Sequence, residues 1–289
     1  MTVTLKTIKG NPMKLDGGAM FGNAPKALWN RWVPCDGENR INIGANCLLI
    51  RTPAHVILFE TGPGAYLSPK MKERFGVVSN RHELLESLAA EGVAPEDLTH
   101  VILSHLHFDH SGGLLSAHVH DSKSELVFPH ARFVTGREQF ERSIDPKTRD
   151  RASFIPELAP LLEESGRLDL VSAGDTLSLG PVSISFFQSQ GHTPGMLVSF
   201  ITIGETCLVF TGDLVPGTPW VNLPITMGYD RYPEALVEEK AEMLARALEQ
   251  DAWLVFPHDG DFAASRLDMD PVKKRHIPRD ATPCLNLEF

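Results

Sequence analysis

Cysteine is scarce in this sequence, and no two cysteines have the spacing of a redox or structural metal motif. The four cysteines, at positions 35, 47, 207 and 284, form no C-x-x-C pair. Cys47 and Cys207 lie in apolar runs that are typical of strands, where a free cysteine packs as a small hydrophobic side chain. A disulfide framework is therefore not expected, and a reducing, cytoplasmic location fits this usage.

Long apolar runs and basic clusters are also missing. No segment approaches the roughly 18 consecutive apolar residues of a transmembrane helix, and residues 1–18 lack the apolar core of a secretory signal. The net charge is −10, and the one short basic run, 273–276, lies near the C-terminus. Nucleic acids and anionic membranes are bound by basic surfaces, so neither is an expected partner. The expected partner is a small-molecule substrate.

The composition is that of a folded globular chain. Hydrophobic residues make up 42% of the 289 positions and charged residues 22%, which is enough apolar material for a large core. Neither an internal repeat nor a low-complexity linker divides the chain. We therefore expect a single domain over residues 1–289, in which residues 1–40 form an N-terminal extension that packs near the active site.

Strand-like apolar runs alternate with helical patterns along the chain. The expected helices are 81–91, one that begins at 136–141, and 233–248, which has a proline near its first turn. This order predicts an α/β fold with two sheets covered by helices. The expected strands are 3–8, 45–51, 55–60, 98–103, 131–134, 182–190, 196–203, 206–210 and 253–256.

The most informative segment is SHLHFDHSGG, residues 104–113, which follows an apolar strand. His105 and His107 are two residues apart, so on extended chain both imidazoles point the same way and can reach one ion. Asp109 and His110 follow as the chain turns, and can reach a neighbouring ion. Imidazoles and carboxylates are the ligands of zinc and related metals, so this segment predicts a metal site.

Three further candidate ligands each follow an expected strand and lie beside glycine or proline. His192 occurs in GHTPG, Asp213 in TGD and His258 in PHDG. Loops at strand ends converge on a rigid base, and for this reason functional sites are often built there. We therefore expect these three side chains to complete the site begun by residues 105–110.

The ordered set of these seven residues resembles the metallo-β-lactamase superfamily over roughly residues 40–262. The resemblance implies a four-layer αββα sandwich of mixed sheets with helices on the outer faces, and two divalent metal ions at one edge. Zinc is the first expectation, with manganese, iron or cobalt as alternatives. By the resemblance, His105, His107 and His192 hold the first ion, Asp109, His110 and His258 hold the second, and Asp213 bridges both.

Within the superfamily, the sequence is similar to the lactonase-like branch associated with quorum quenching. Asp213 is the bridging carboxylate that lactonases and glyoxalase-II-type thioesterases carry and true β-lactamases lack. The best-studied acyl-homoserine lactonases place a tyrosine three residues after this aspartate, where this chain has Pro216, and Tyr229 is a candidate to supply the phenol from another direction. Glu60 replaces the aspartate of many members and is expected to hydrogen-bond a ligand histidine.

The resemblance implies a hydrolase that opens a lactone or carboxylic ester with a metal-bridging hydroxide. Asp109 is the candidate catalytic residue that orients the nucleophile and carries a proton to the leaving oxygen. Ser104 has no neighbouring base in the sequence and is not expected to act as a nucleophile. An apolar groove for an acyl chain is expected from Met20, Phe21, Phe108, Leu214, Trp220 and Tyr229.

Other functions would use the same candidate ligands. A glyoxalase-II-like thioesterase would need a basic pocket, usually from a C-terminal helical region, and the tail after His258 is short. A phosphotriesterase or phosphodiesterase of the same fold is a further alternative, although the acidic net charge does not favour a nuclease. A metal-binding module without catalysis is the alternative from another class. The N-terminal extension also suggests a homodimer, if it covers the pocket of a partner subunit.

Overall fold

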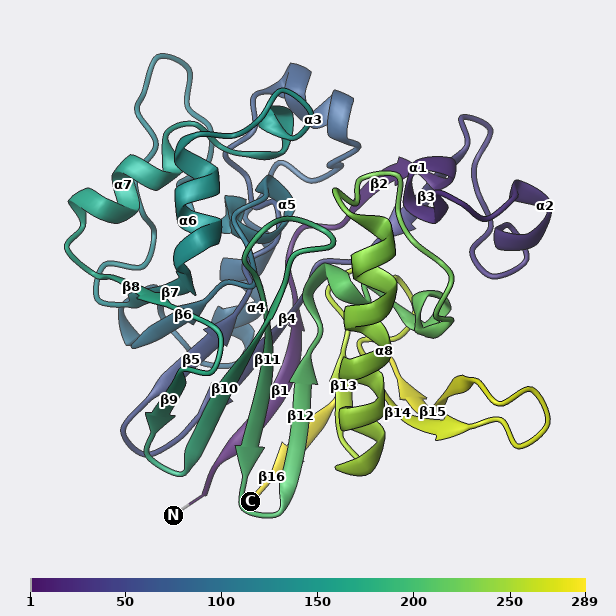
Figure 1. The fold of residues 1–289 in the computed structure, drawn as a ribbon. Coiled ribbons are helices and arrows are strands. Elements are labelled where there is room, and N and C mark those ends of the chain that lie inside the picture. Colours follow the sequence, from purple (N-terminus) through teal and green to yellow (C-terminus); the bar gives the residue numbers. More distant parts are fainter. Residues whose placement is uncertain (1) are drawn as a thin grey trace.

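The computed structural model describes residues 2–289 and contains two seven-stranded sheets that pack face to face (Figure 1). The first sheet has the order β16-β1-β4-β5-β6-β7-β8 and the second the order β15-β14-β13-β12-β11-β10-β9. Both mix parallel and antiparallel neighbours. The first comprises β1 (Thr4–Lys9), β4 (Asn46–Arg51), β5 (Val56–Phe59), β6 (His100–Ile102), β7 (Arg132–Gly136), β8 (Leu168–Val171) and β16 (Asn286–Glu288); the second comprises β9 (Thr176–Leu179), β10 (Val182–Ser189), β11 (Met196–Ile203), β12 (Thr206–Phe210), β13 (Trp253–Val255), β14 (Ala264–Met269) and β15 (His276–Thr282).

Both faces of the central strands are buried, which explains their continuous apolar runs. In β4, Leu48 and Ile50 point into the core between the sheets, whereas Cys47 and Leu49 belong to the outer core under the helices. Phe59 of β5 stacks on Phe210 of β12 across the interface, with ring centroids 5.9 Å apart. Alternate side chains of one strand therefore serve two different cores.

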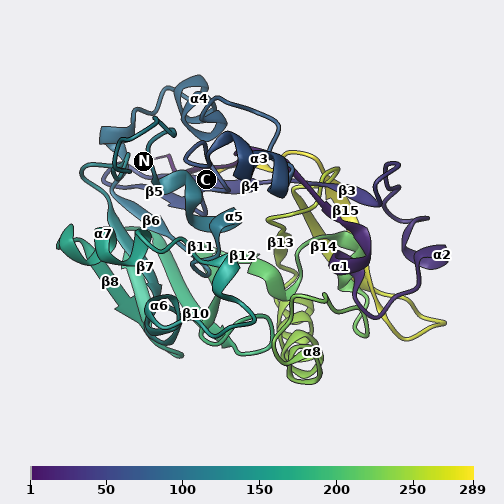
Figure 2. The same cartoon turned by 90° about the horizontal axis from the view of Figure 1, so that it is seen from above.

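Helices cover the outer faces of both sheets, as expected for an αββα sandwich. Figure 2 shows α3 (Pro69–Phe75) and α4 (Glu83–Ala90) on one outer side of the sheets and α8 (Pro233–Glu249) on the other. Helix α4 buries Leu84 and Leu88. Helix α6 (Arg137–Ile144), beside α7 (Leu158–Glu164), packs on β7 and β8. Within residues 2–289, every helix is too short or too polar to cross a bilayer.

The N-terminal segment differs from the expected extension, because its first strand belongs to the sheet. Strand β1 lies between β16 and β4, and Leu5 is completely buried. The rest of the segment forms α1 (Gly17–Phe21), α2 (Lys26–Trp29) and a small sheet of β2 (Met13–Asp16) with β3 (Arg40–Ile43). Residue 1 lies outside the described residues. The extension is therefore the part from about residue 13 to residue 40.

Strand direction explains why distant ligands share one edge of the sandwich. Strands β5 and β6 are parallel, and so are β12 and β13. Strand β10 runs in the direction of β12, because both pair antiparallel with β11. The C-terminal ends of β6, β10, β12 and β13 are followed by residues 105–110, His192, Asp213 and His258 respectively.

Candidate metal centre

The 104–113 segment leaves β6 as extended chain and then turns into the short helix α5 (Phe108–Ser111). His107 precedes the helix, and its carbonyl accepts a hydrogen bond from the backbone N–H of His110 at 3.1 Å. The turn rests on the loop after β5, where the N–H and hydroxyl of Thr61 both donate to the His110 carbonyl at 2.9 Å. A Cβ on Gly113 would lie 2.2 Å from the Thr61 carbonyl oxygen, so the close approach requires glycine.

Three buried histidines form the first group of candidate ligands. Nε2 of His105 lies 3.0 Å from Nδ1 of His107, and Nε2 of His192 lies 3.2 Å from the same Nδ1 atom. All three side chains are at least nine-tenths buried. One ligand atom from each lies close enough to the other two to hold a single ion.

The second group brings α5 together with the end of β13. Nε2 of His110 and Nε2 of His258 are 2.9 Å apart. Oδ2 of Asp109 lies 3.5 Å from Nε2 of His258 and 3.9 Å from Nε2 of His110. These three residues also satisfy the distances for a shared ion.

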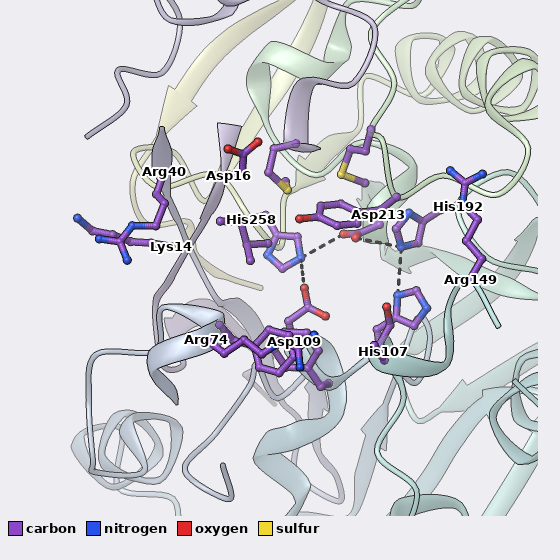
Figure 3. A pocket seen from close by; sticks show the side chains of 18 of the residues that line it. Lys14, Asp16, Arg40, Arg74, His107, Asp109, Arg149, His192, Asp213 and His258 are labelled. Atoms are coloured by element: carbon purple, nitrogen blue, oxygen red, sulfur yellow. Dashed lines mark hydrogen bonds and ion pairs between the residues drawn. The ribbon is translucent and has the colours of Figure 1, made fainter. Parts of the chain in front are cut away.

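Asp213 lies between the two groups (Figure 3). Its Oδ2 atom is 3.3 Å from Nε2 of His192, and its Oδ1 atom is 3.3 Å from Nε2 of both His110 and His258. Oδ1 is buried and accepts no hydrogen bond from residues 2–289. A buried carboxylate oxygen without a donor is costly unless a cation or water meets it.

The residues present fit two divalent cations. Zinc lies about 2.0–2.1 Å from imidazole nitrogens, so several nitrogens about 3 Å apart and aimed at one point match a common ion. The donor set of five imidazoles and two carboxylates is suited to zinc, manganese, iron or cobalt. The sequence placed these seven residues at one site, and the structure brings all seven together: His105, His107, Asp109, His110, His192, Asp213 and His258.

The electrostatics of the centre favour metal binding. Burial and the nearby His110 and His107 lower the pKa of His105 well below its ordinary value. Burial opposes the charge on Asp213, but His110, His258 and His192 hold the pKa of its carboxyl group well below the ordinary value. Against the effect of burial, Asp213 in turn raises the pKa of His110 and His258. A cation would replace the protons on these two imidazoles.

Three of the candidate ligand histidines make a further contact through Nδ1 that fixes the orientation of the ring. Nδ1 of His105 lies 2.9 Å from the hydroxyl of Ser104, which fits the expectation that Ser104 is not a nucleophile. Nδ1 of His258 lies 3.0 Å from the Gly44 carbonyl oxygen. Nδ1 of His192 lies 2.9 Å from Oδ1 of Asp230. The sequence did not identify Asp230, because no ligand spacing marks it.

Glu60, which was expected to hydrogen-bond a ligand histidine, lies beside the candidate ligand His110. Its Oε2 atom is 3.2 Å from Nδ1 of His110, and its Oε1 atom accepts a hydrogen bond from the backbone N–H of Ser104 at 2.7 Å. The residue has a φ of 63°, a left-handed conformation that is uncommon outside glycine. This backbone conformation turns a buried carboxylate toward the start of the 104–113 segment.

A cavity of about 440 Å³ opens above the candidate ligands. Met20, Phe108 and Tyr229, three of the residues expected to form an apolar groove, line this cavity. The remainder of the N-terminal extension contributes Leu15, and α3 contributes Phe75, whose ring centroid lies 4.3 Å from that of Phe108. The lining therefore combines an apolar part with the charged and imidazole side chains that also line the cavity.

Three residues predicted to line the groove lie elsewhere. Phe21, Leu214 and Trp220 are outside this cavity, and at most 2% of each is exposed. Phe21 stacks on Trp220 at a centroid distance of 4.5 Å, and the indole N–H of Trp220 donates to the Met20 carbonyl. Phe21 and Trp220 therefore pack the extension onto the sandwich. Burial in the core explains why these two positions are aromatic.

Pro216 and Tyr229 have different positions relative to the centre. The carbonyl of Pro216 accepts a hydrogen bond from the backbone N–H of His258 at 2.9 Å, so this residue supports a candidate ligand through the main chain. Tyr229 lines the cavity, and burial, with contributions from Asp109 and Asp16, raises the pKa of its phenol to about 12. The phenol therefore stays protonated near neutral pH and can donate a hydrogen bond.

Similar proteins of known sequence include lactonases and thioesterases. The chain is 25% identical over 220 residues to the N-acyl homoserine lactonase AiiB of Agrobacterium fabrum, which covers 68% of this chain and 75% of that protein. It is 25% identical over 178 residues to the human acyl-coenzyme A thioesterase MBLAC2, which covers 59% of this chain and 58% of that protein. The match to the thioesterase thus spans less than two thirds of its length.

Solved structures share the fold over almost the whole chain. A probable metal-dependent hydrolase from Staphylococcus aureus is 27% identical, with a TM-score of 0.83 over 97% of this chain and 98% of that one. AidC, a dizinc quorum-quenching lactonase, is 20% identical, with a TM-score of 0.75 over 96% and 93%. Residues 41–258 match the family model described as the metallo-beta-lactamase superfamily. The chain belongs to the metallo-β-lactamase superfamily.

Proposed function

We propose that this protein is a two-metal hydrolase that opens lactones or related carboxylic esters. The observation that supports it most directly is the position of Asp213, whose two oxygens face two separate groups of buried imidazoles. Such a carboxylate suits a bridging role between two cations, for which zinc is our first choice. The lactonase AiiB, among the relatives, makes N-acyl homoserine lactones the leading substrate class.

Different residues of the chain would contribute to different steps of ester hydrolysis. When bound, two divalent ions would supply an activated water as nucleophile and polarise the ester carbonyl. Asp109 has 13% of its side chain exposed, more than Asp213, and it lines the cavity. Its carboxylate can orient the attacking water, accept a proton from it and pass that proton to the leaving alkoxide.

Tyr229 is proposed to act as a hydrogen-bond donor to the substrate. It lines the cavity together with Asp109 and His258. Its raised pKa, about 12, keeps the phenol protonated during turnover. The phenol can therefore donate a hydrogen bond and stabilise negative charge that develops on the ester oxygen.

The apolar part of the cavity suits an acyl chain. Leu15, Met20, Phe75, Phe108 and Met227 all line it, and they come from four separate parts of the chain. Burying each methylene of a substrate there contributes about 0.8 kcal/mol. The proposed substrates are therefore acyl lactones or esters.

The decisive experiment is a panel of lactones, aryl esters, thioesters and phosphotriesters with the metal-reconstituted enzyme. We expect the highest kcat/KM on an acyl lactone and loss of turnover when a chelator removes the metal. If no member of the panel is hydrolysed by protein that contains two metal ions per chain, the proposal is refuted.

A thioesterase is the second candidate, favoured by the alignment with the acyl-coenzyme A thioesterase. Such a thioesterase needs a basic pocket. Cationic side chains line the cavity, and they come from segments other than the short tail after His258. Within the panel, a thioester such as S-lactoylglutathione that outperforms every lactone would establish this alternative.

A further inference from the structure

Five cationic side chains line the cavity above the candidate metal centre, although the net charge of the chain is −10. They come from the N-terminal extension, α3, the segment after α6 and the loop before α8. Because they are far apart in the sequence, they form no basic run from which a basic pocket could have been predicted. Three carboxylates also line the cavity: Asp109 and Asp213, which are candidate metal ligands, and Asp16, which accepts hydrogen bonds from the Ala19 N–H and the Asn39 amide. The cationic residues are Lys14, Arg40, Arg74, Arg149 and Arg231.

Two of these cations are already neutralised. Nζ of Lys14 lies 3.3 Å from Oδ2 of Asp36, and Nε of Arg40 lies 3.2 Å from the same oxygen. Arg40 also pairs with Glu38 at 2.7 Å. These two side chains therefore have structural partners and leave little charge for a ligand.

Arg149 and Arg231 have no carboxylate within 4.0 Å among residues 2–289. They are held by neighbouring backbone carbonyls instead. Nη2 of Arg149 donates to the Gly228 carbonyl at 3.0 Å, and Nε of Arg231 donates to the Tyr229 carbonyl at 2.8 Å. The two guanidinium groups are thus oriented by one short loop that also lines the cavity.

Their environment compensates the positive charge only in part, because Asp150 and Asp230 raise the pKa of Arg231 without contacting it, against the larger effects of burial and Arg149. Nη1 of Arg231 is buried and has no acceptor among the described residues. An unpartnered buried donor on a charged group is costly, and two guanidinium groups close together repel each other. Burial, followed by the nearby Arg149, lowers the pKa of Arg231. A bound anion would offset both penalties.

We propose that Arg149 and Arg231 form a binding site for an oxyanion on the substrate, so that the enzyme prefers acyl esters or thioesters that carry a carboxylate or phosphate. Guanidinium groups suit this role because they offer paired N–H donors that match the geometry of these anions. Both residues line the same cavity as His107 and His192, and Figure 3 shows Arg149 on the His192 side of the pocket, opposite Lys14 and Arg40. The inference rests on the proposed ester hydrolysis, with the anion remote from the bond that is cleaved.

A matched pair of esters tests this preference. Mono-4-nitrophenyl glutarate carries a carboxylate where 4-nitrophenyl valerate carries a methyl group, and the reacting ester is otherwise the same. We expect Arg149→Gln and Arg231→Gln each to lower kcat/KM for the glutarate ester by about tenfold or more, the value of one charged hydrogen bond. Turnover of the valerate ester should change by less than about threefold, and Arg149→Lys should recover part of the preference.

Arg137→Gln is the charge-matched control. Arg137 is exposed, lies outside the cavity and begins α6, so its loss removes one positive charge without touching the site. Equal losses on both esters in the Arg149 and Arg231 variants would show that the arginines only support the loop, and would overturn the inference.

A binding measurement separates this inference from the proposed function. Calorimetry with the metal-loaded protein should show tighter binding of glutarate than of valerate, with the difference lost in Arg149→Gln. If neither ester is hydrolysed, the proposed function fails, and this measurement still decides the inference. Equal affinities for the two acids in the wild-type protein would refute it.

The nature of the anion is resolved by a second pair of substrates. S-acyl pantetheine and S-acyl 4′-phosphopantetheine differ by one phosphate, and the Arg149→Gln variant should lose its preference for whichever anion the site takes. A preference for the phosphorylated thioester alone identifies a phosphate site, and a preference for the glutarate ester alone identifies a carboxylate site. No preference within either pair would contradict an oxyanion site.

Discussion

Nδ1 of His192 lies 2.9 Å from Oδ1 of Asp230, and both side chains are buried. The other oxygen of Asp230 accepts a hydrogen bond from the backbone N–H of Met227 at 2.6 Å. The carboxylate therefore holds the imidazole with Nε2 turned toward His107 and Asp213. Such contacts fix the tautomer and the orientation of a ligand histidine.

We predict that Asp230→Asn weakens metal binding by roughly 10- to 100-fold, because the amide no longer supplies the carboxylate that orients His192. Titration against a competing chelator measures this affinity directly. Asp261→Asn, at an exposed position, is the matched control. An affinity equal to that of the wild-type protein would show that the contact is not needed to orient the ligand.

Asp213→Asn tests the bridging role. The amide offers one neutral oxygen in place of two charged ones, so we expect the number of metal ions per chain to fall from two to one or fewer. Elemental analysis of the purified, metal-supplied variant gives this ratio. Asp121→Asn, with an exposed side chain, is the control for loss of one carboxylate.

Retention of two ions together with full lactonase activity in Asp213→Asn would contradict a bridging role. Circular dichroism should accompany the measurement, since Asp213 is buried among histidines. A variant with wild-type secondary structure and reduced metal content is the expected result.

The positions of the candidate ligands could be predicted from the sequence because they depend on where strands end. His192, Asp213 and His258 follow strands that run in one direction, and a period-2 or continuous apolar run marks each of these strands. The helix expected over 233–248 is observed as Pro233–Glu249. Buried strands and an amphipathic helix leave a clear pattern because each must bury a defined face.

Elements with polar or exposed faces left no such pattern. Strand β15 contains Pro278 and Arg279 and has no buried residue, and β14 ends with an exposed pair of residues. Pairing with a neighbouring strand, rather than burial, defines them. Two aromatic residues that were expected to line the groove, Phe21 of the extension and Trp220 of the segment before α8, stack on each other, and only tertiary packing shows this.

The paired contacts around the ligands could not be predicted for another reason. Asp230, Arg149 and Arg231 lie far from the 104–113 segment in the sequence and carry no spacing that links them to it. Their roles depend on how the loop before α8 folds over the ends of the strands. Such proximity is a property of the assembled fold.

Tyr229→Phe tests the proposed donor. Loss of the phenol should lower kcat on an acyl lactone by roughly 10- to 100-fold, because one donor to the developing negative charge is removed. Metal content should be unchanged, since the ring remains and no candidate ligand is touched. Tyr232→Phe, at a residue 56% exposed, is the matched control. Unchanged kcat in Tyr229→Phe would exclude the phenol from the reaction.

Lys240 provides a test of stability against pH. Its side chain in α8 is completely buried, and Nζ donates to the carbonyls of Ile225 at 2.5 Å and Trp220 at 3.2 Å. Burial lowers the pKa of this amine from 10.5 to about 8. Between these two values the unfolded state binds more protons than the folded state, so the free energy of unfolding rises with pH in that window.

Below about pH 8 the amine is protonated in both states, and the cost of burying its charge is constant. Above that pH the folded protein loses this proton first, so the cost of burying the charge disappears and the free energy of unfolding rises by up to about 3 kcal/mol by pH 10.5. Lys240→Met removes the titrating group and keeps the length of the side chain. Urea unfolding of both proteins from pH 7 to pH 10 should therefore show the wild-type protein gaining stability relative to the variant, while Lys70→Met, at an exposed lysine, shows no such difference. A constant difference between the wild-type protein and Lys240→Met across this range would show that the buried amine does not change its protonation on folding.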